Sequence, residues 1–437
     1  MTVGGRASSF ETRLADWVDV GEALSRILEA ATPLPSEPVP LNDAFGRALA
    51  AEVVAAATLP PWDNSAMDGY AVRAEDIAGA SESAPRSLSV IGTVRAGSDA
   101  GARIGAGEAI RIMTGAPVPD GSDTIVRVED TDAEAVEGTV TIFATRDSGR
   151  HIRDAGQDMR AGTTLLSPGR TLTPGTIGVL AAAGRDRVLV HRAPVVALLP
   201  TGDELRNADA YRDVVQGRGV PESNTPMLSA MIRSVRGEPT LLGIASDDET
   251  DLRDKIDAAR DADVLVTIGG ASMGDADLVK RVLDGSGYEH GFWRVKMRPG
   301  SPLGFGWLPR GERRQPVFGL PGNPSSAFVT FEVFVRPFLL RLAGHDRVLR
   351  RTVTCVAAER MATPSSLTYF QRVVLTRRGR DTVAALTGPQ TSGLVSGLAA
   401  ADGLAVVPPD RDAVEAGEPV DVMLLDDGLR ADEHPVW

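Results

Sequence analysis

Three short apolar segments, each followed at once by a glycine- or proline-rich loop, most restrict what this chain can fold into. Residues 195–199, 264–268 and 317–320 are almost wholly apolar, as expected for strands buried on both faces of a sheet. Segments 225–235 and 249–260, between these runs, carry apolar residues at helical spacing. This alternation predicts an α/β domain whose mostly parallel sheet has helices on both faces.

The rest of the chain is helical near its start and β-rich in two separate stretches. Helical spacing predicts a helix over 20–31, a second short helix is expected over 41–54, and a third over 173–183. Between 87 and 144, and again after 347, short β-prone runs are broken by Gly, Asp and Pro. We expect an all-β insert in the first stretch and a small β-barrel in the second.

Three local signals make sharper predictions. Asp19, followed three residues later by Glu22, resembles a capping box at the start of the first helix. Residues 241–245 are expected to form a strand of the parallel sheet. A long helix over 324–343 is expected to be kinked near Pro337, because proline lacks the N–H that a helix needs.

Composition excludes several classes of function. The 437 residues predict several domains, and 46 Lys and Arg against 59 Asp and Glu give a formal charge of −13, which argues against general nucleic-acid binding. The single cysteine, Cys355, cannot build a disulfide framework or a thiolate zinc site. Residues 1–10 do not resemble a secretory signal, and no apolar stretch approaches the roughly 20 residues of a membrane helix. We therefore expect a cytoplasmic protein.

The loops after the three apolar segments are the expected ligand site, because ligands bind at the carboxyl ends of strands in such sheets. Two of these loops, 269–277 and 319–324, contain more than one glycine, and glycines let backbone N–H groups approach a phosphate closely. Neither matches a known nucleotide-binding fingerprint, and one such loop alone is weak support. Together with the loop 200–204, they mark three strand ends of one sheet, which favours an anion site more strongly.

Carboxylates stand near the same strand ends. Glu204, Asp247 and Asp277 follow the predicted strands, and carboxylates that face a phosphate site typically hold Mg²⁺. The pair Asp247 and Asp248 has a second interpretation of equal weight, as the N-cap of the helix predicted over 249–260.

Two further groups of charged residues are candidates. Strand-like alternation places Arg294 and Arg298 on one face, which favours a paired site for an oxyanion, although a solvated strand face is the common alternative. In the segment 60–72, turn chemistry does not account for both Asp63 and Asp68.

Together, these segments resemble the family that contains bacterial MoeA and the gephyrin E-domain. The resemblance extends from about residue 20 to 417 and rests on many separate blocks in the order of the family. These blocks are 63–70, 110–119, 156–158, 201–205, 223–225, 269–277, 298–300 and 320–324.

The resemblance implies a multi-domain α/β and β protein. It implies an elongated helical domain (1–55 and 146–190), a β insert (56–145), a three-layer α/β molybdopterin-binding domain (191–346) and a C-terminal β-barrel (347–437). It further implies a homodimer, in which Asp68 and Thr114 complete a site built mainly by the partner chain.

The reaction implied by the resemblance is insertion of molybdate into adenylated molybdopterin, with Mg²⁺-assisted release of AMP. The polar active-site residues would be Asp68, Thr114, Arg153, Asp158, Glu204, Asp247 and Asp277, the metal ligands among them being Glu204, Asp247 and Asp277. Substrate would be bound by Asn224, Gly269, Gly270, Ser272, Gly274, Gly322 and Asn323. Molybdate would be surrounded by Arg294, Arg298, Pro321, Pro324 and Ser396.

The chain departs from the family at the molybdate residues, where the family often has lysine in place of Arg294 and Arg298 and a Lys-Pro pair in place of Ser301-Pro302. Arginine keeps the charge but not the shape of a lysine. Two other functions stay open: a molybdopterin adenylyltransferase, which shares the α/β domain, and a non-catalytic scaffold of the gephyrin type. Protein partners would be the adenylyltransferase and molybdoenzyme maturation proteins.

Overall fold

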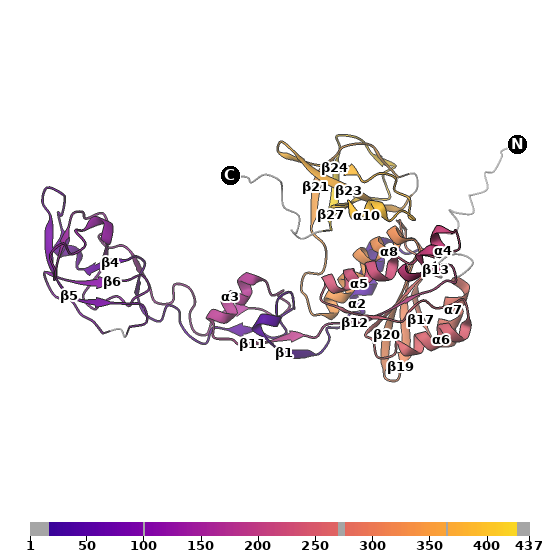
Figure 1. Cartoon of the computed structure of the whole chain (residues 1–437), viewed down its shortest axis with the longest axis horizontal. Helices are drawn as coiled ribbons and strands as arrows, with labels where there is room; N and C mark the ends of the chain where they lie inside the picture. Colours follow the sequence, from indigo (N-terminus) through magenta and orange to yellow (C-terminus); the bar gives the residue numbers. More distant parts are fainter. Residues whose placement is uncertain (1–16, 99–100, 270–275, 364–365, 426–437) are drawn as a thin grey trace. The chain divides into compact units, whose positions relative to one another are not determined.

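The computed structural model describes residues 17–98, 101–269, 276–363 and 366–425, which form two compact units. The first unit comprises Met1–Ala51, Pro168–Pro174 and Arg187–Trp437, and the second comprises Glu52–Ser167 and Gly175–Asp186 (Figure 1). The four domain boundaries expected from the sequence stay a prediction.

The first unit contains a six-stranded sheet with four parallel strands, as the apolar segments predict. Its order is β15 (Glu238–Leu241), β12 (Val195–Pro200), β16 (Val264–Ile268), β20 (Arg313–Leu320), β19 (Gly304–Arg310) and β17 (Glu289–Phe292). The first four strands are parallel, whereas β19 is antiparallel to both β20 and β17. Every residue of β16 is buried, because helices cover both faces of the sheet.

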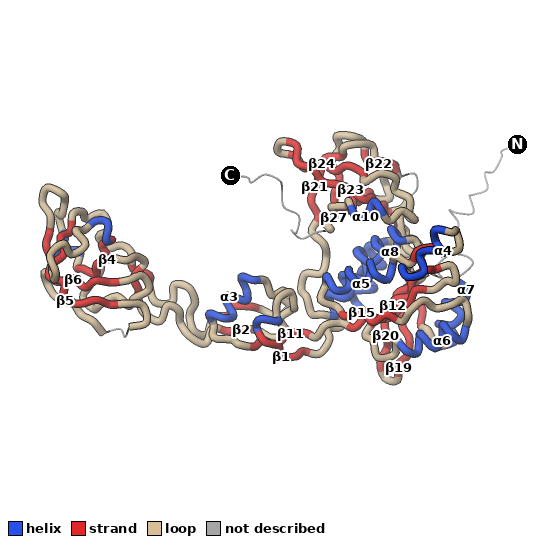
Figure 2. The backbone as a smooth tube through the Cα atoms, in the orientation of Figure 1, coloured by secondary structure: helices blue, strands red, loops and turns tan. Residues whose placement is uncertain are grey.

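Helices on opposite faces build two separate cores, which confirms the three-layer architecture (Figure 2). On one face lie α2 (Val20–Glu29), α5 (Asn224–Ser234) and a long helix that begins at Pro324. On the other lie α6 (Glu249–Ala258) and α7 (Ala276–Gly285).

The long helix has the predicted irregularity near Pro337. It consists of α8 (Pro324–Thr330), a π-helical turn η5 (Phe331–Val335) and α9 (Arg336–Leu342). The π turn ends two residues before Pro337, which cannot donate a backbone hydrogen bond, so the helix changes its pitch just before the proline. None of the helices in the described part of the chain is long and apolar enough to cross a bilayer.

The C-terminal part of this unit is the expected β-barrel. Its ring runs β23 (Thr368–Arg378), β24 (Asp381–Leu386), β21 (Thr352–Ala357), β27 (Pro419–Leu424) and β25 (Gly403–Val407), and β25 pairs back with β23. A short strand, β18 (Met297–Arg298), joins β23 in parallel and places Arg298 opposite Tyr369. The barrel is therefore tied to the segment that leads from β17 to β19.

The second unit contains the expected all-β insert and the helix α3 (Pro174–Ala182). Its sheet has the order β7 (Thr124–Arg127), β4 (Gly69–Val72), β6 (Glu108–Ile112), β5 (Arg86–Val94) and β8 (Thr139–Ile142). Apolar side chains pack on both faces, with Tyr70 and Val72 in one cluster and Ala71 and Ile125 in the other.

The helix predicted over 41–54 is wrong. Only Leu41–Asp43 is helical, as the 3-10 turn η1, and Val53–Val54 forms β2, which pairs with β10 (Thr164–Leu166). Gly46 explains the failure, because its φ of 76° lies in the left-handed region that a helix cannot continue through.

Two other local predictions also need correction. The strand expected over 241–245 instead ends at Leu241, and Gly243 with a φ of 74° turns the chain. Asp19 does precede α2, but its side chain makes no capping hydrogen bond; its carboxylate lies 3.3 Å from the ammonium of Lys296. The predicted capping box is therefore wrong, and Asp19 instead forms an ion pair with Lys296.

Candidate functional site

The three predicted loops meet around one cavity of about 720 Å³ at the carboxyl edge of the parallel sheet. Gly202 and Glu204 line it after β12, Gly269 after β16, and the segment 321–324 after β20. The strand order brings these loops together, because β12, β16 and β20 are neighbours that run in the same direction.

Glycine is required where two of these loops touch. The N–H of Gly269 donates to the Leu320 carbonyl at 3.0 Å, and its φ is 96°. A Cβ at this position would lie 2.9 Å from the backbone oxygen of Thr201, which is too close for any side chain. Gly269, one of the glycines that suggested an anion site, therefore also allows the ends of β12 and β16 to approach each other.

Asn224 connects the start of α5 to the third loop and leaves one polar atom unused. Its side-chain amide donates to the Gly322 carbonyl at 2.7 Å, whereas its Oδ1 is buried and has no hydrogen-bond partner among the described residues. A buried acceptor without a partner is uncommon in proteins, and this one belongs to a residue of the cavity wall. Asn224 therefore has a side-chain acceptor available for a hydrogen bond from a bound ligand.

The neighbours Asp247 and Asp248 have different roles. Asp248 is the N-cap of α6 and accepts hydrogen bonds from the N–H groups of Thr250 and Asp251. Asp247 lines the cavity, and it exchanges backbone-to-carboxylate hydrogen bonds of 3.1 and 3.4 Å with Asp203. The N-cap interpretation therefore holds for Asp248, and the interpretation of Asp247 as a metal ligand stays a prediction.

The predicted metal ligands are only partly visible. Glu204 and Asp247 are exposed on the wall of the cavity. Asp277 lies in the first turn of α7, but its side chain is outside the described residues, as are Gly270, Ser272 and Gly274. Within the described ranges, no group of three or more His, Cys, Asp or Glu side chains is arranged to hold a metal ion.

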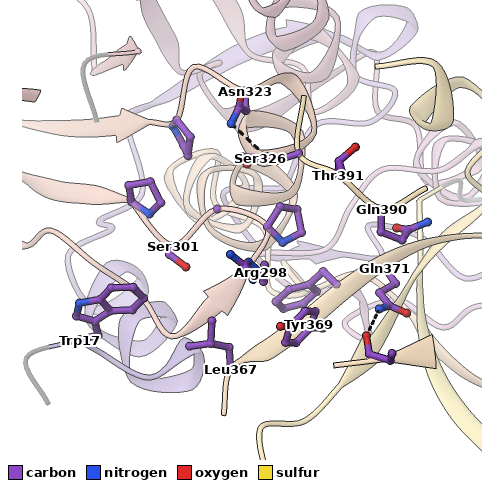
Figure 3. A pocket seen from close by; sticks show the side chains of 17 residues that line it. Trp17, Arg298, Ser301, Asn323, Ser326, Leu367, Tyr369, Gln371, Gln390 and Thr391 are labelled. Atoms are coloured by element: carbon purple, nitrogen blue, oxygen red, sulfur yellow. Dashed lines mark hydrogen bonds between the residues drawn. The ribbon is translucent and has the colours of Figure 1, made fainter. Parts of the chain in front are cut away.

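A second cavity, also of about 720 Å³, lies between the sheet edge and the barrel (Figure 3). Arg298 and Gln390 line it, and Asn323 and Pro321 line both cavities. The side-chain amide of Asn323 donates to the hydroxyl of Ser392 at 3.1 Å. The two cavities therefore adjoin at a hydrogen-bonded pair from the N-cap of α8 and the barrel.

Arg294 and Arg298 do not form the predicted pair. Arg298 faces the second cavity, whereas the guanidinium of Arg294 lies 5.3 Å from the ring centroid of Trp17. The physical reason is that only Met297–Arg298 forms a strand, so the alternation assumed from Arg294 onward does not hold.

Ser396 is also outside both cavities. It begins the short helix α10 (Ser396–Ala399) and is exposed, while Ser392, four residues earlier, lines the second cavity. Sequence reasoning missed Ser392 because no local pattern distinguishes one serine of this loop from the other. Its contact with Asn323 spans 69 residues of sequence.

Sequence reasoning also missed Arg372, a wholly buried guanidinium in β23. Its Nη2 donates to the Pro389 carbonyl at 2.8 Å, but Nε and Nη1 have no hydrogen-bond partner within the part of the chain that the structure describes, and burial lowers the pKa of Arg372. The backbone N–H of Arg372 also donates to Oε1 of Gln390, at 2.8 Å. Arg372 therefore supports the loop that carries Gln390 and Ser392 to the cavity.

The second unit carries the other predicted polar residues. The backbone N–H and the hydroxyl of Thr114 donate to Oδ1 of Asp68 at 2.7 and 2.8 Å. Arg153 is exposed in β9 (Ile152–Arg153), opposite Asn64 of β3 (Asn64–Ser65). Asp158 is exposed and held by its backbone N–H, which donates to the Leu59 carbonyl at 3.1 Å.

Comparison with known proteins accounts for nearly the whole chain. Residues 18–184 match the family described as the MoeA N-terminal region (domain I and II). Residues 197–341 match the probable molybdopterin binding domain, and residues 354–425 match the MoeA C-terminal region (domain IV).

Similar proteins extend over almost the same length. Molybdopterin molybdenumtransferase 2 of Mycobacterium tuberculosis is 36% identical over 405 residues, covering 91% of this chain and 96% of that protein. Molybdopterin molybdenumtransferase of Staphylococcus aureus is 31% identical over 420 residues, covering 95% and 97%.

A solved structure shares the architecture. The molybdopterin biosynthesis moeA protein from Pyrococcus horikoshii OT3 aligns with a TM-score of 0.79 at 28% identity, over 93% of this chain and 100% of that one. Together with the sequence identity to the transferases, this likeness establishes the relationship: the chain belongs to the MoeA family.

Proposed function

We propose that this protein inserts molybdate into adenylated molybdopterin and releases AMP with the help of Mg²⁺. The observation that carries the proposal is the pair of adjoining cavities that share Asn323. One has acids and glycine loops suited to phosphate and Mg²⁺, and the other has an arginine and hydroxyl groups suited to an oxyanion. Molybdate insertion needs a phosphate site next to an oxyanion site, because the phosphate and the point of insertion belong to one substrate molecule.

In the proposal, the phosphates occupy the cavity at the sheet edge. The glycines of its loops leave room for close approach, and the unused Oδ1 of Asn224 accepts a hydrogen bond from the nucleotide part. In the same loop, outside the described residues, Gly270, Ser272 and Gly274 would also contact the phosphates.

The residues present fit a Mg²⁺ ion that is completed by substrate. Mg²⁺ prefers oxygen ligands and is commonly held by one or two carboxylates plus phosphate oxygens. Glu204 and Asp247 supply two exposed carboxylates on one cavity wall, and we propose Asp277 as a third. When bound, the ion would neutralise charge that develops as the phosphoanhydride bond breaks.

We place molybdate in the second cavity, beside Arg298 and Ser392. The guanidinium offers several N–H donors to the oxygens of the anion, and the serine hydroxyl offers another. Pro321 lines both cavities and so forms part of the wall between them. Arg294 and Ser396 have no direct role in this proposal.

A second copy of the chain supplies the remaining acid in this proposal. Asp68 is exposed and oriented by Thr114, and an oriented surface carboxylate becomes useful when another surface closes over it. We propose a homodimer in which Asp68, Thr114, Arg153 and Asp158 of one protomer face the sheet edge of its partner. Coexpression of inactive Asp68→Ala and Asp247→Ala chains should restore about a quarter of wild-type activity, because random pairing leaves one intact site in half of the dimers.

The function is tested by Asp277→Ala. The variant should keep the melting temperature of the wild type but lose molybdate-dependent AMP release. An unchanged rate would overturn the proposed site. An adenylyltransferase would instead form adenylated molybdopterin from molybdopterin and ATP, and a scaffold of the gephyrin type would release no AMP.

We further propose that the protein acts in the cytoplasm, where it receives its substrate from a molybdopterin adenylyltransferase and passes its product to molybdoenzyme maturation proteins. The absence of a membrane-spanning helix from the described residues is compatible with this assignment.

A further inference from the structure

The cavity that holds Arg298 has two chemically different ends. Figure 3 shows Asn323 and Thr391 at one end, and Trp17 and Leu367 at the other. The first end is polar. At the second end, an aromatic wall is formed by Trp17, Leu367 and Tyr369, which share one apolar cluster. A cavity that combines aromatic side chains with polar groups is typical of small-molecule sites.

Trp17 is held at this wall because the residue after it, Val18, forms an isolated β-bridge. Val18 pairs in parallel with Val295: its N–H donates to the Arg294 carbonyl at 3.0 Å, and its carbonyl accepts from Lys296 at 2.9 Å. The ion pair between Asp19 and Lys296 fixes the same segment from the side. The indole is therefore held in place by backbone hydrogen bonds on both sides of Val18.

Two neighbours fix the indole ring itself. The guanidinium of Arg294 lies over the ring, and the ring packs against the apolar core of the barrel, to which Leu367 and Tyr369 belong. An arginine over an indole is a stabilising cation–π contact. Arg294, which the sequence suggested as an oxyanion ligand, thus supports an aromatic wall instead.

We infer that Trp17 forms the subsite for the pterin ring of the substrate, an inference that rests on the proposed function. The order of chemical groups along the substrate carries the argument. Phosphate, dithiolene and pterin follow one another in adenylated molybdopterin, with the dithiolene as the point of molybdate insertion. The structure has the same order: acids and glycine loops, then Arg298 and Ser392, then the aromatic wall.

This order also distinguishes the pterin from the adenine, which is the other ring of the substrate. The adenine is attached beyond the phosphates, so it belongs on the far side of the cavity that contains Glu204 and Asp247. The ring next to the oxyanion end is the one attached directly to the dithiolene. Trp17 is therefore a specificity-determining residue for the pterin and not for the nucleotide.

The test is equilibrium binding of three separate probes, free pterin, AMP and molybdate, to the full-length protein. Trp17→Ala should weaken pterin binding about tenfold, because an aromatic contact and its buried area are lost. Trp17→Phe should recover most of the affinity. Binding of AMP and of molybdate should change less than about twofold, since neither carries the pterin ring.

Trp307→Ala is the matched control, because Trp307 also lies beneath an arginine, at 4.4 Å from Arg314, but is not part of either cavity wall. It should leave pterin binding unchanged, and melting temperatures identify any variant that fails to fold. Wild-type protein that does not bind pterin, or Trp17→Ala that binds it as tightly as wild type, overturns the inference. If the wild-type protein binds pterin through Trp17 but releases no AMP when molybdate is added, the proposed function is overturned and the pterin subsite is not.

Discussion

Thr114 donates two hydrogen bonds to the same oxygen of Asp68, one from its backbone N–H at 2.7 Å and one from its hydroxyl at 2.8 Å. The two residues are 46 positions apart and lie in the second unit. The backbone bond, and then the side-chain bond, lowers the pKa of Asp68, so this exposed carboxylate stays ionised and oriented before any ligand arrives.

Removal of one of these hydrogen bonds should raise the pKa of Asp68. Thr114→Val keeps the backbone donor and the shape of the side chain but deletes the hydroxyl, so the carboxylate should protonate at a higher pH than in wild type. The acid limb of the pH–rate profile should move upward with it, and Thr114→Ser should restore the wild-type profile. Identical profiles for the Val variant and wild type would show that Asp68 takes no part in turnover.

Adjacent aspartates at the start of α6 should give opposite results. Asp248→Ala removes the N-cap and should destabilise the protein by about 1 kcal/mol, with turnover retained. Asp247→Asn keeps the volume but removes a charge from the cavity wall, so it should lower turnover about a hundredfold with little change in stability. Chemical unfolding and AMP release measure the two effects. A loss of turnover in Asp248→Ala alone would reverse this assignment.

The strands and loops around the first cavity could be predicted because their signals are local. The apolar run at 264–268 has the bounds of β16, and the glycine after it is where the strand ends meet. Other local signals failed, as two examples show. Gly46 breaks the helix expected around it, and a shorter strand than expected leaves Arg294 facing Trp17.

The second cavity could not be predicted, because it depends on long-range pairings. Arg298 of β18 pairs with Tyr369 of the barrel strand β23, and Asn323 contacts Ser392 in a loop of the barrel. Neither pairing leaves a periodic trace in the sequence. Resemblance to the family suggested a serine in this region, but only the fold distinguishes Ser392 from Ser396.

Substitution of the two serines checks the placement of molybdate. Ser392→Ala removes a hydroxyl of the cavity wall and should raise the KM for molybdate about tenfold, with a smaller effect on kcat. Ser396→Ala, on the exposed turn of α10, should raise it less than about twofold. The reverse order of effects would place the anion elsewhere.

Asp147 should make the second unit sensitive to acid. Burial alone would raise its pKa, but hydrogen bonds from Arg127 and His151 outweigh burial and hold the pKa at about 2. Its contribution to stability, on the order of 2 kcal/mol, is therefore complete above about pH 4 and is lost as the pH falls through about 2. Asp147→Asn should unfold more easily at neutral pH and show a flatter dependence on acid. If the free energy of unfolding fell equally in wild type and Asp147→Asn between about pH 4 and about pH 2, the assignment would be contradicted.

The central claim is tested most directly by the balance of products from adenylated molybdopterin and Mg²⁺, with and without molybdate. The wild-type protein should release AMP only when molybdate is present, in the same molar amount as the molybdenum cofactor that forms. AMP release at an equal rate without molybdate, or no cofactor formed alongside the AMP, would contradict molybdate insertion as the function of this chain.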